Sequence, residues 1–412
     1  MSGLNFLNKL LDGVDVEWLS LGELGDFIRG NGLQKKDFVE SGFPAIHYGQ
    51  IYTRYGLSAD KTFTYVLPEL ANKLRKAQKN DLLLATTSEN DEDVVKPLAW
   101  LGDNVAISGD MMLFRHEQNV KYLAYFFQSE IFQTQKMKYI TGAKVRRVSS
   151  GDLSKIKIPI PCSNNPEKSL AIQSEIVRIL DKFTALTAEL TAELTAELNM
   201  RKKQYNYYRD QLLSFKEGEV EWKTLGEVAQ YSKTRISFEL LDERNYVGVD
   251  NLLQNRAGKS LSNHVPTSGK LTEFIPTDIL IGNIRPYLKK IWQADCIGGT
   301  NGDVLVIRCI DSSINTRYLY QILADDKFFE YNMQHAKGAK MPRGSKEDIM
   351  KYPIPVPPLT LQARIVEILD KFDTLTNSIT EGLPREIELR QKQYEYYRDL
   401  LFSFPKPETV SN

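Results

Sequence analysis

One long segment of this chain occurs twice. Residues 170–215 and residues 359–404 align over 46 positions without a gap, and 25 of those positions are identical. An internal duplication of this kind constrains the architecture more than any local pattern, because both copies must fold in the same way. The chain is therefore predicted to consist of two similar halves, each of which ends in a long helix.

The duplication extends upstream of the two helical segments. The sequence Gly-Ala-Lys at residues 142–144 recurs at 338–340. Residues 29–75, by contrast, have no convincing counterpart in residues 233–272. Two copies that share a frame but differ between the matched positions suit two modules that bind different targets.

The order of the repeated parts is circular. Residues 9–13 resemble the end of one helical copy, and they run into a Glu-Trp motif at Glu17 and Trp18. The chain ends after its second helical copy, at the point where that motif would begin again. We therefore expect the two chain ends to lie near each other.

The segments between the helical copies indicate an α+β fold. Short apolar runs after turn residues predict strands at 81–87, 110–115 and 303–308, and helical spacing predicts helices at 121–138 and 316–334. We expect two mixed α/β domains separated by two long antiparallel helices that form an intramolecular coiled coil, with a pseudo-twofold and circular organisation. The expected division is 1–160 and 218–357 for the two domains, 161–217 for the central helical repeat, and 358–412 for the distal helical repeat and C-terminal tail.

Apolar residues recur every four positions in both long helices. They are Leu186, Leu190, Leu194 and Leu198 in the first copy, and Leu375, Ile379, Leu383 and Ile387 in the second. Amphipathic helices of this kind require a partner. Pairing within the chain is favoured because one polypeptide holds both copies, and dimerisation between chains is the alternative. A helix of 46 residues would be roughly 70 Å long, and Gly382 and Pro384 should kink the second one.

Residues 187–198 contain the tetrapeptide Thr-Ala-Glu-Leu three times in tandem. Each unit adds about 6 Å to a helix, which corresponds to nearly two base pairs of a duplex at about 3.4 Å each. The repeat is either a spacer of adjustable length or a sequence that simply favours helix.

Composition excludes several classes of protein. With 412 residues, 42% hydrophobic and 26% charged, the chain is typical of a globular protein of two or three domains. No apolar run approaches the roughly 18 residues that span a membrane. Three distant cysteines, Cys162, Cys296 and Cys309, indicate reduced thiols in a cytoplasmic protein. A net charge of zero argues against nonspecific binding of polyanions but allows a local basic surface.

No catalytic or metal-binding pattern is evident in the sequence. The four histidines are scattered and lack the spacing of metal ligands. Gly258-Lys-Ser260 lacks the earlier glycine of a phosphate-binding loop, since Leu253 stands in its place. Glu221 and Lys223 match a short fragment found in nucleases, but patterns of three residues arise often by chance. We expect a chain that is not catalytic by itself.

Two matched basic loops give the clearest functional signal. The residues are Lys144, Arg146 and Arg147 in the first half, and Lys337, Lys340, Arg343 and Lys346 in the second. Such clusters release counterions from phosphates, and arginine can also bind guanine in the major groove. Two basic patches at equivalent places on a neutral protein are typical of a clamp on one DNA duplex. Two solvated surface loops are the alternative.

Weaker candidates for contacts to bases surround the predicted strands. They are Gln50, Tyr52 and Arg54, then Thr87 and Ser88, and in the second half Arg285, Tyr287 and Lys289. Amide, hydroxyl and guanidinium groups can read base edges. Each of these residues taken singly is more often an ordinary surface residue.

The combined pattern resembles a known family. Gln-x-x-Ile-Val-x-Ile-Leu-Asp-Lys-Phe and Gln-Tyr-x-Tyr-Tyr-Arg-Asp stand in both helical copies, at 173–183 and 204–210 and again at 362–372 and 393–399. With two divergent segments between them, the chain resembles the DNA specificity subunit of type I restriction–modification systems. The three tetrapeptides are similar to those of the IC subfamily.

The resemblance implies a function and partners. Each variable segment would be a target-recognition domain that reads one half of a bipartite, asymmetric site in double-stranded DNA, and the helices would set the length of the unread spacer. Two methyltransferase subunits that use S-adenosylmethionine would dock on the helices and domains. Restriction subunits that use ATP and Mg²⁺ would join them in the bacterial cytoplasm. This chain itself would hold no cofactor.

Two other classes of function remain open from the residues alone. A coiled-coil scaffold would bind proteins through its variable domains and would show no sequence-dependent affinity for DNA. A nuclease based on Glu221 and Lys223 would cut DNA in a metal-dependent way without partners.

Overall fold

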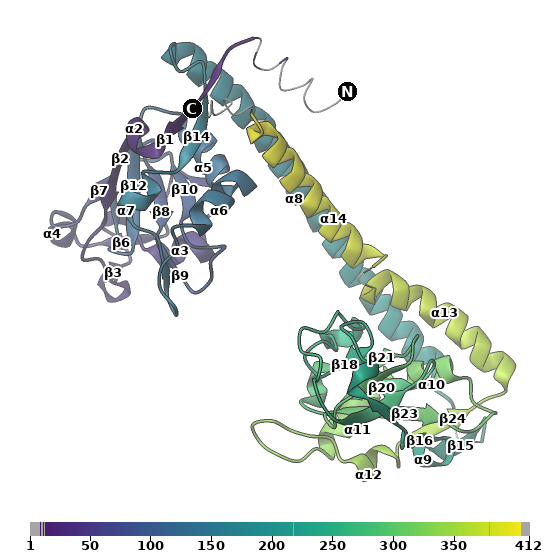
Figure 1. Cartoon of the computed structure of the whole chain (residues 1–412). Helices are drawn as coiled ribbons and strands as arrows, with labels where there is room; N and C mark the ends of the chain where they lie inside the picture. The colour runs from purple at the N-terminus through teal and green to yellow at the C-terminus, as the bar shows by residue number, and fades with distance from the viewer. Residues whose placement is uncertain (1–8, 10, 12, 217, 379, 405–412) are drawn as a thin grey trace. The chain divides into compact units, whose positions relative to one another are not determined.

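The computed structural model describes residues 9, 11, 13–216, 218–378 and 380–404. The chain divides into two compact units. Unit 1 contains residues 1–189 together with 391–412, and unit 2 contains residues 190–390. Figure 1 labels the helices and strands of both. Each unit therefore combines one mixed α/β domain with parts of the long helices.

The domain of unit 1 is built on two sheets. Its strands are β1 (Val16–Ser20), β2 (Gly25–Arg29), β3 (Phe38–Val39), β4 (Phe43–Ile46), β5 (Ser58–Ala59), β6 (Thr64–Val66), β7 (Lys76–Ala77), β8 (Leu82–Ala85), β9 (Thr87–Ser88), β10 (Lys96–Trp100), β11 (Val105–Ile107), β12 (Met111–His116), β13 (Arg146–Arg147) and β14 (Lys157–Pro161). The five-stranded sheets have the orders β2-β12-β8-β10-β5 and β3-β6-β4-β11-β7, and β1–β14 and β9–β13 form two-stranded ribbons. The helices are α2 (Leu21–Leu24), α3 (Tyr48–Thr53), α4 (Pro68–Ala71), α5 (Val120–Gln128), α6 (Glu130–Met137) and α7 (Ser150–Leu153), and the 3₁₀ turn η1 covers Lys35–Asp37.

The domain of unit 2 repeats this plan with smaller sheets. Its strands are β15 (Glu221–Thr224), β16 (Ala229–Tyr231), β17 (Arg235–Ser237), β18 (Tyr246–Val247), β19 (Lys270–Phe274), β20 (Ile279–Gly282), β21 (Ile291–Gln293), β22 (Gly298–Thr300), β23 (Val304–Cys309) and β24 (Pro353–Val356). The sheet orders are β16-β23-β20-β21 and β17-β19-β22-β18, with the ribbon β15–β24. The helices are α9 (Leu225–Val228), α10 (Thr316–Leu323), α11 (Asp326–Gln334) and α12 (Lys346–Ile349), and 3₁₀ turns cover η2 (Phe238–Leu240), η3 (Gln254–Arg256) and η4 (Pro286–Leu288).

The central strand of each domain is buried on both faces. In β8, Leu82 and Leu84 join the core that includes α5 and α6, while Leu83 and Ala85 join a second core. Side chains alternate between the faces of a strand, so a continuous apolar run produces this two-sided burial. Strand β20 of unit 2 divides its side chains between two cores in the same way.

Residues that match between the two copies hold matching structural positions. Asp81 is buried before β8 and forms an ion pair of 2.7 Å with Arg115 of β12. Asp278 is buried before β20 and forms an ion pair of 2.7 Å with Arg308 of β23. A buried carboxylate needs such a partner. The shared frame therefore consists of residues that fix one strand against the next.

Three long helices complete the units. Helix α8 (Pro166–Leu212) has 47 residues, and the boundary between the units falls within it. The second helical copy is interrupted and forms α13 (Leu359–Asn377) and α14 (Leu383–Phe402).

The interruption in the second copy is stronger than the expected kink. Gly382 has a φ of +82°, and a Cβ there would lie 2.5 Å from the backbone oxygen of Thr374. Only glycine adopts this conformation without strain. Pro384 lies in the first turn of α14, where the N–H that it lacks would have no partner within the helix. Sequence and geometry therefore agree on a helix end followed by a new helix start.

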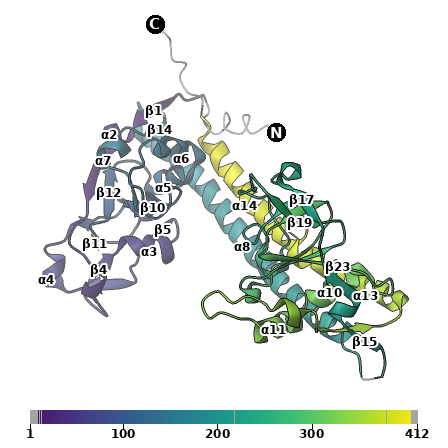
Figure 2. The ribbon, with the colours of Figure 1, turned by 60° about the horizontal axis from the view of Figure 1, so that its bottom comes forward.

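The long helices pack on each other within the chain. In unit 1, Phe183 of α8 stacks on Tyr397 of α14 with ring centroids 5.3 Å apart. Figure 2 shows the ribbons of α8 and α14 side by side. In unit 2, Tyr205 and Tyr208 of α8 both stack on Phe372 of α13, at 6.0 and 5.5 Å. The predicted α+β fold, with two mixed-sheet domains and long helices that pack together, is confirmed.

The expected leucine seam is only partly buried. Its half-buried members are Leu190, Leu194, Leu198, Leu375, Leu383 and Ile387. Leu186 is 52% exposed and lies off the seam, contrary to the spacing argument. Ile379 lies outside the described residues. These helices therefore pack through the aromatic stacks described above as well as through a partly buried leucine seam.

The described ends of the chain lie in one core, as the circular order predicts. Leu11 is buried in the same cluster of unit 1 as Phe402 and Phe404. Phe402 contacts the rings of Tyr122 and Phe126, with centroids 5.2 and 5.6 Å apart. The end of the second helical copy thus completes the core of the first domain.

Among the residues that the structure describes, no helix is both long and apolar enough to cross a membrane.

Replacing Phe402 by Ala should destabilise unit 1 by about 3–5 kcal/mol, because the ring is fully buried among two other rings. Hydrogen–deuterium exchange at α5 and α6 measures this loss of protection. Leu186→Ala, at an exposed position of α8, is the control and should change exchange little. Equal protection in the Phe402 variant and the control would contradict the assignment of the C-terminal helix to this core.

Candidate nucleic-acid interface

The first basic loop is a closed hairpin that follows α6. Thr141 and Arg147 exchange two backbone hydrogen bonds of 2.9 Å, and β13 pairs with β9 through Arg146 and Ser88. Gly142 has a φ of +93°, and a Cβ there would lie 2.1 Å from the backbone oxygen of Val145. The hairpin therefore requires glycine at its start, and it presents the following residues to solvent.

The second basic loop closes in the same way. Lys337 and Arg343 exchange two backbone hydrogen bonds of 2.9 Å, and Gly338 has a φ of +100°. An additional bridge joins Arg343 to Ile284, just after β20. The repeated Gly-Ala-Lys sequence thus encodes one local structure twice.

The basic side chains of these hairpins differ in what they contact. Arg146 donates to the Gly142 carbonyl oxygen at 2.6 Å and pairs with Asp91 at 2.8 Å. Arg343 pairs with Asp303 at 3.0 Å, although its side chain is 57% exposed. Exposed pairs of this kind are worth about 0–1 kcal/mol, so a phosphate can replace the carboxylate. The other predicted basic residues are exposed: Lys144, Arg147, Lys337, Lys340 and Lys346.

The weaker candidates of unit 1 separate into two groups. Gln50 is buried, accepts from the His47 N–H at 2.9 Å and donates to Thr64 at 3.2 Å. The Tyr52 hydroxyl lies 2.9 Å from the Thr87 carbonyl oxygen, and burial raises the pKa of Tyr52. These polar groups are used inside the domain.

The remaining candidates of unit 1 differ in their exposure to solvent. Ser88 lies in β9 directly beside the basic hairpin, whereas the Thr87 side chain is buried there. Arg54 is exposed and lies over the Phe63 ring at 5.8 Å. The structure therefore brings Ser88 to the basic hairpin through the β9–β13 ribbon.

In unit 2 the candidates after β20 are divided in a similar way. Arg285 and Tyr287 are exposed, and the Arg285 N–H donates to the Pro342 carbonyl oxygen at 2.7 Å. Arg285 therefore lies beside the second basic hairpin. Lys289 instead pairs with Asp326 at 2.7 Å and is half-buried.

Sequence reasoning missed a buried lysine in unit 1. The Lys136 ammonium is fully buried and donates to the carbonyl oxygens of Glu92 and Val94 at 2.8 and 3.0 Å. Burial lowers the pKa of Lys136 to about 8, although nearby carboxylates, first that of Asp93, oppose the shift. This lysine ties down the acidic loop that holds Asp91, the partner of Arg146. A signal was present, because position 136 lies four residues after buried Phe132 on the same helical face.

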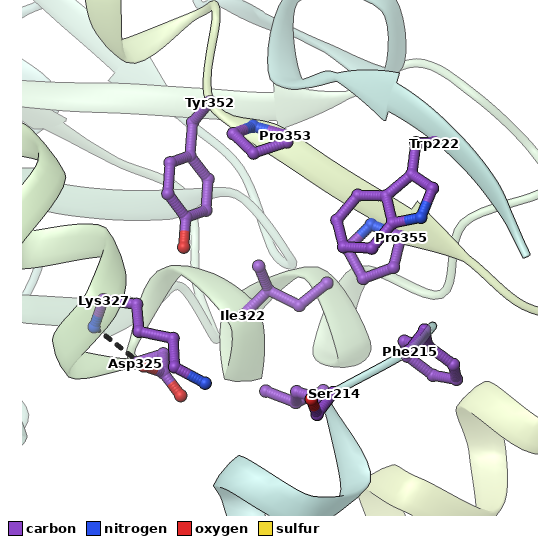
Figure 3. Close-up of a pocket in the computed structure, with 10 residues that line it drawn as sticks. Ser214, Phe215, Trp222, Ile322, Asp325, Lys327, Tyr352, Pro353 and Pro355 are labelled. Carbon is purple, nitrogen blue, oxygen red and sulfur yellow. Dashed lines mark hydrogen bonds between the residues drawn. The ribbon is translucent and has the colours of Figure 1, made fainter. Parts of the chain in front are cut away.

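A pocket in unit 2 lies beside the ribbon β15–β24 and the residues that follow α8. It has a volume of about 250 Å³, and its walls include Trp222, Pro355 and Ile322 (Figure 3). Unit 1 has Phe126 at the position of Ile322, and that ring is buried in its core. No group of three or more His, Cys, Asp or Glu that could bind a metal occurs among the described residues.

The buried ammonium makes a prediction about pH. The folded-state pKa of Lys136 lies below the usual 10.5, so the unfolded chain binds more protons between about pH 8 and 10.5. The free energy of unfolding of unit 1 should therefore rise with pH in this window, by roughly 3 kcal/mol at most. Urea denaturation of Lys136→Met should lack this slope.

Lys138→Met is the matched control, because that lysine is exposed and follows directly after the end of α6. A slope that survives in Lys136→Met, or that both variants lose equally, would contradict the assignment to the buried ammonium.

Comparisons with known proteins agree with this geometry. The family model described as type I restriction modification DNA specificity domain matches residues 13–200 and 217–389. The EcoR124I/EcoR124II specificity subunit of Escherichia coli is 42% identical to the chain and covers 100% of both proteins. The EcoprrI specificity subunit of Escherichia coli is 35% identical over 92% of this chain and 93% of that protein.

A solved chain from a study of complex assembly in the type I restriction–modification system shares the fold. Its TM-score is 0.60 at 17% identity, over 94% of this chain and 97% of that chain. The matches cover both units and both helical copies. The chain therefore belongs to the type I restriction–modification specificity subunits, the non-catalytic components that supply DNA specificity through target-recognition domains.

Proposed function

We propose that each domain of this chain reads one half of a bipartite, asymmetric site in double-stranded DNA. Residues 1–160 form the first recognition domain and residues 218–357 the second. The observation that carries the proposal is the pair of closed basic hairpins, which occur at equivalent places on one frame. The sheets beside them differ in strand number between the two units. Equal phosphate contacts combined with unequal reading surfaces are what two different half-sites require.

The side chains divide into two roles under this proposal. The exposed lysines and arginines of the hairpins contact phosphates, which supply affinity and register but little sequence information. Residues at the adjoining strand ends, Ser88 in unit 1 and Arg285 and Tyr287 in unit 2, are placed to reach base edges. Arg54, Lys289, Gln50, Tyr52 and Thr87 are weaker candidates, and all but Arg54 are held by contacts inside their domains or buried.

The long helices set the spacer between the half-sites. The three Thr-Ala-Glu-Leu units lie within α8, where Leu190, Leu194 and Leu198 are half-buried. Each unit contributes four residues of regular helix, so units can be added or removed without breaking the hydrogen-bond pattern. Such a segment acts as a spacer of adjustable length.

Two methyltransferase subunits bind the helices, and restriction subunits join that assembly in the bacterial cytoplasm. The motif Tyr-Tyr-Arg-Asp leaves exposed aromatic rings on both copies: Tyr207 is 61% exposed on α8, and Tyr396 is 63% exposed on α14. Exposed tyrosines at matched positions suit two copies of one protein partner. S-adenosylmethionine, ATP and Mg²⁺ serve those partners, which also flip and methylate the target adenine.

The double variant Lys144→Ala/Arg147→Ala should weaken DNA binding by the assembled methyltransferase several-fold. Each lost phosphate contact lowers the slope of log affinity against log salt by about 1, so the slope should fall by about 2. Binding titrations over a series of salt concentrations measure both quantities. Lys337→Ala/Lys340→Ala should behave alike.

Lys168→Ala is the control, because this exposed lysine lies at the start of α8. Unchanged affinity and slope in both double variants would remove the hairpins from the interface. Retained affinity for any sequence, with no preference for one site, would favour a protein-binding scaffold.

Deleting residues 191–194 should shorten the preferred spacer by about one or two base pairs, because four residues of helix span about 6 Å. Both half-sites should stay the same. Mapping of methylated adenines in cells that carry the variant measures the spacer directly. Thr191→Ala keeps the length of the helix and should keep the original spacer; a deletion variant that also keeps it would contradict the spacer role.

A further inference from the structure

A polar cluster in each unit links a helix of the domain, α5 in unit 1 and α10 in unit 2, to the long helices. Cluster 1 consists of Lys121, Tyr125, Asp181, Thr184 and Tyr394, all in unit 1. Cluster 2 consists of Arg317, Gln321, Asp370, Asp373 and Tyr205, all in unit 2. The repeat alignment makes these residues equivalent one by one, in the order given.

Cluster 1 pairs one cation with one carboxylate. Lys121 of α5 contacts Asp181 of α8 at 2.5 Å, with side chains 23% and 40% exposed. The Tyr125 hydroxyl donates to the other oxygen of Asp181 at 2.8 Å. Thr184 Oγ1 lies 3.1 Å from both the Tyr125 and the Tyr394 hydroxyl oxygens. Thr184, which is the equivalent of Asp373 in cluster 2, thus contributes a neutral side chain.

Cluster 2 pairs one cation with two carboxylates. Arg317 Nε donates to Asp370 at 2.8 Å, and Arg317 Nη2 donates to Asp373 at 2.9 Å. Asp373 is only 15% exposed, and it also accepts a hydrogen bond from the Asn377 side chain at 2.8 Å. Gln321 donates to Asp370 at 2.6 Å and accepts from the Tyr205 hydroxyl at 2.9 Å.

The differences between the clusters are coupled. The aspartate at 181 and 370 and the tyrosine at 394 and 205 are the same in both units. In unit 1 the domain contributes Lys121, and the long helix has Thr184 beside its aspartate. In unit 2 the domain contributes the forked guanidinium of Arg317, and the long helix has a second aspartate, Asp373. Arginine donates in two directions at once, whereas a lysine ammonium acts as a single point charge. The lysine therefore meets one carboxylate, and the arginine meets two, one on each side of its guanidinium.

We propose that the two clusters are specificity contacts, which match each recognition domain to its own position on the long helices. A domain with Lys121 placed against Asp370 and Asp373 would have one ammonium for two carboxylates that arginine contacts through two different nitrogens. A domain with Arg317 placed against Asp181 and Thr184 would have a single carboxylate for its guanidinium, with a neutral hydroxyl in place of the second one. Losing one partner of a partly buried pair is more costly than losing an exposed pair. The clusters thus specify which domain occupies which position, whatever bases each domain reads.

The test is a reciprocal exchange of the residues that differ between the two clusters, made in the full chain and purified with its methyltransferase partner. In unit 2, Arg317→Lys and Asp373→Thr are made singly and together; in unit 1, Lys121→Arg and Thr184→Asp are made likewise. Hydrogen–deuterium exchange at α10 and at α5 reports how firmly each domain is seated. Neither set of variants alters a residue of the basic hairpins.

Asp373→Thr and Thr184→Asp should each raise exchange in their own unit about tenfold, and each double variant should return to within about threefold of the natural chain. Rescue in both units supports the matching of domain to position, because the effects of two independent losses of contact would instead add up. The proposal would be overturned if exchange in the double variants equalled the summed effects of the single substitutions, or if the single substitutions had no effect on exchange. DNA affinity measured on the same samples separates this outcome from a failure of the proposed DNA interface.

Discussion

Neither domain closes its own hydrophobic core, and the rest of the structure depends on that constraint. In unit 1 the core is completed by Phe402 and Phe404, which come from the far end of the chain. In unit 2 it is completed by Tyr205 from α8 and by Ile365 and Leu369 from α13. Burial contributes roughly 1.5–3 kcal/mol for each of the phenylalanine, isoleucine and leucine side chains among them. A domain that needs helix residues to bury its apolar face cannot turn freely on the helix. Each domain is therefore fixed to the long helices of its own unit.

Rigid attachment gives the basic hairpins a defined orientation. Each hairpin is closed by paired backbone hydrogen bonds and begins at a glycine with positive φ. Its basic residues therefore project from a fixed base rather than from a mobile loop. On a chain with no net charge, two such local concentrations of positive charge can favour DNA binding without making the whole surface attractive to polyanions.

The sequence predicted the features that rest on repetition and on local pattern. The duplicated helices, the strands around β8 and β23, and the shared core of Leu11 with Phe402 all follow from spacing and alignment. The weaker candidates at Gln50 and Tyr52 show where this reasoning fails. Their partners, among them Thr64 and the Thr87 backbone, are 14 and 35 residues distant, and no single-sequence pattern reports such contacts. Lys136 illustrates the same limit, because only the fold reveals that the acceptors of its ammonium are the carbonyl oxygens of Glu92 and Val94.

The central claim is that two separately seated domains read two separate half-sites. The most direct test is to replace residues 218–357 by the corresponding domain of a relative with a different specificity and to map methylated adenines across a genome. The account predicts that one half-site changes, while the other half-site and the spacer stay as they were. A change in both half-sites, or in the spacer, would contradict it.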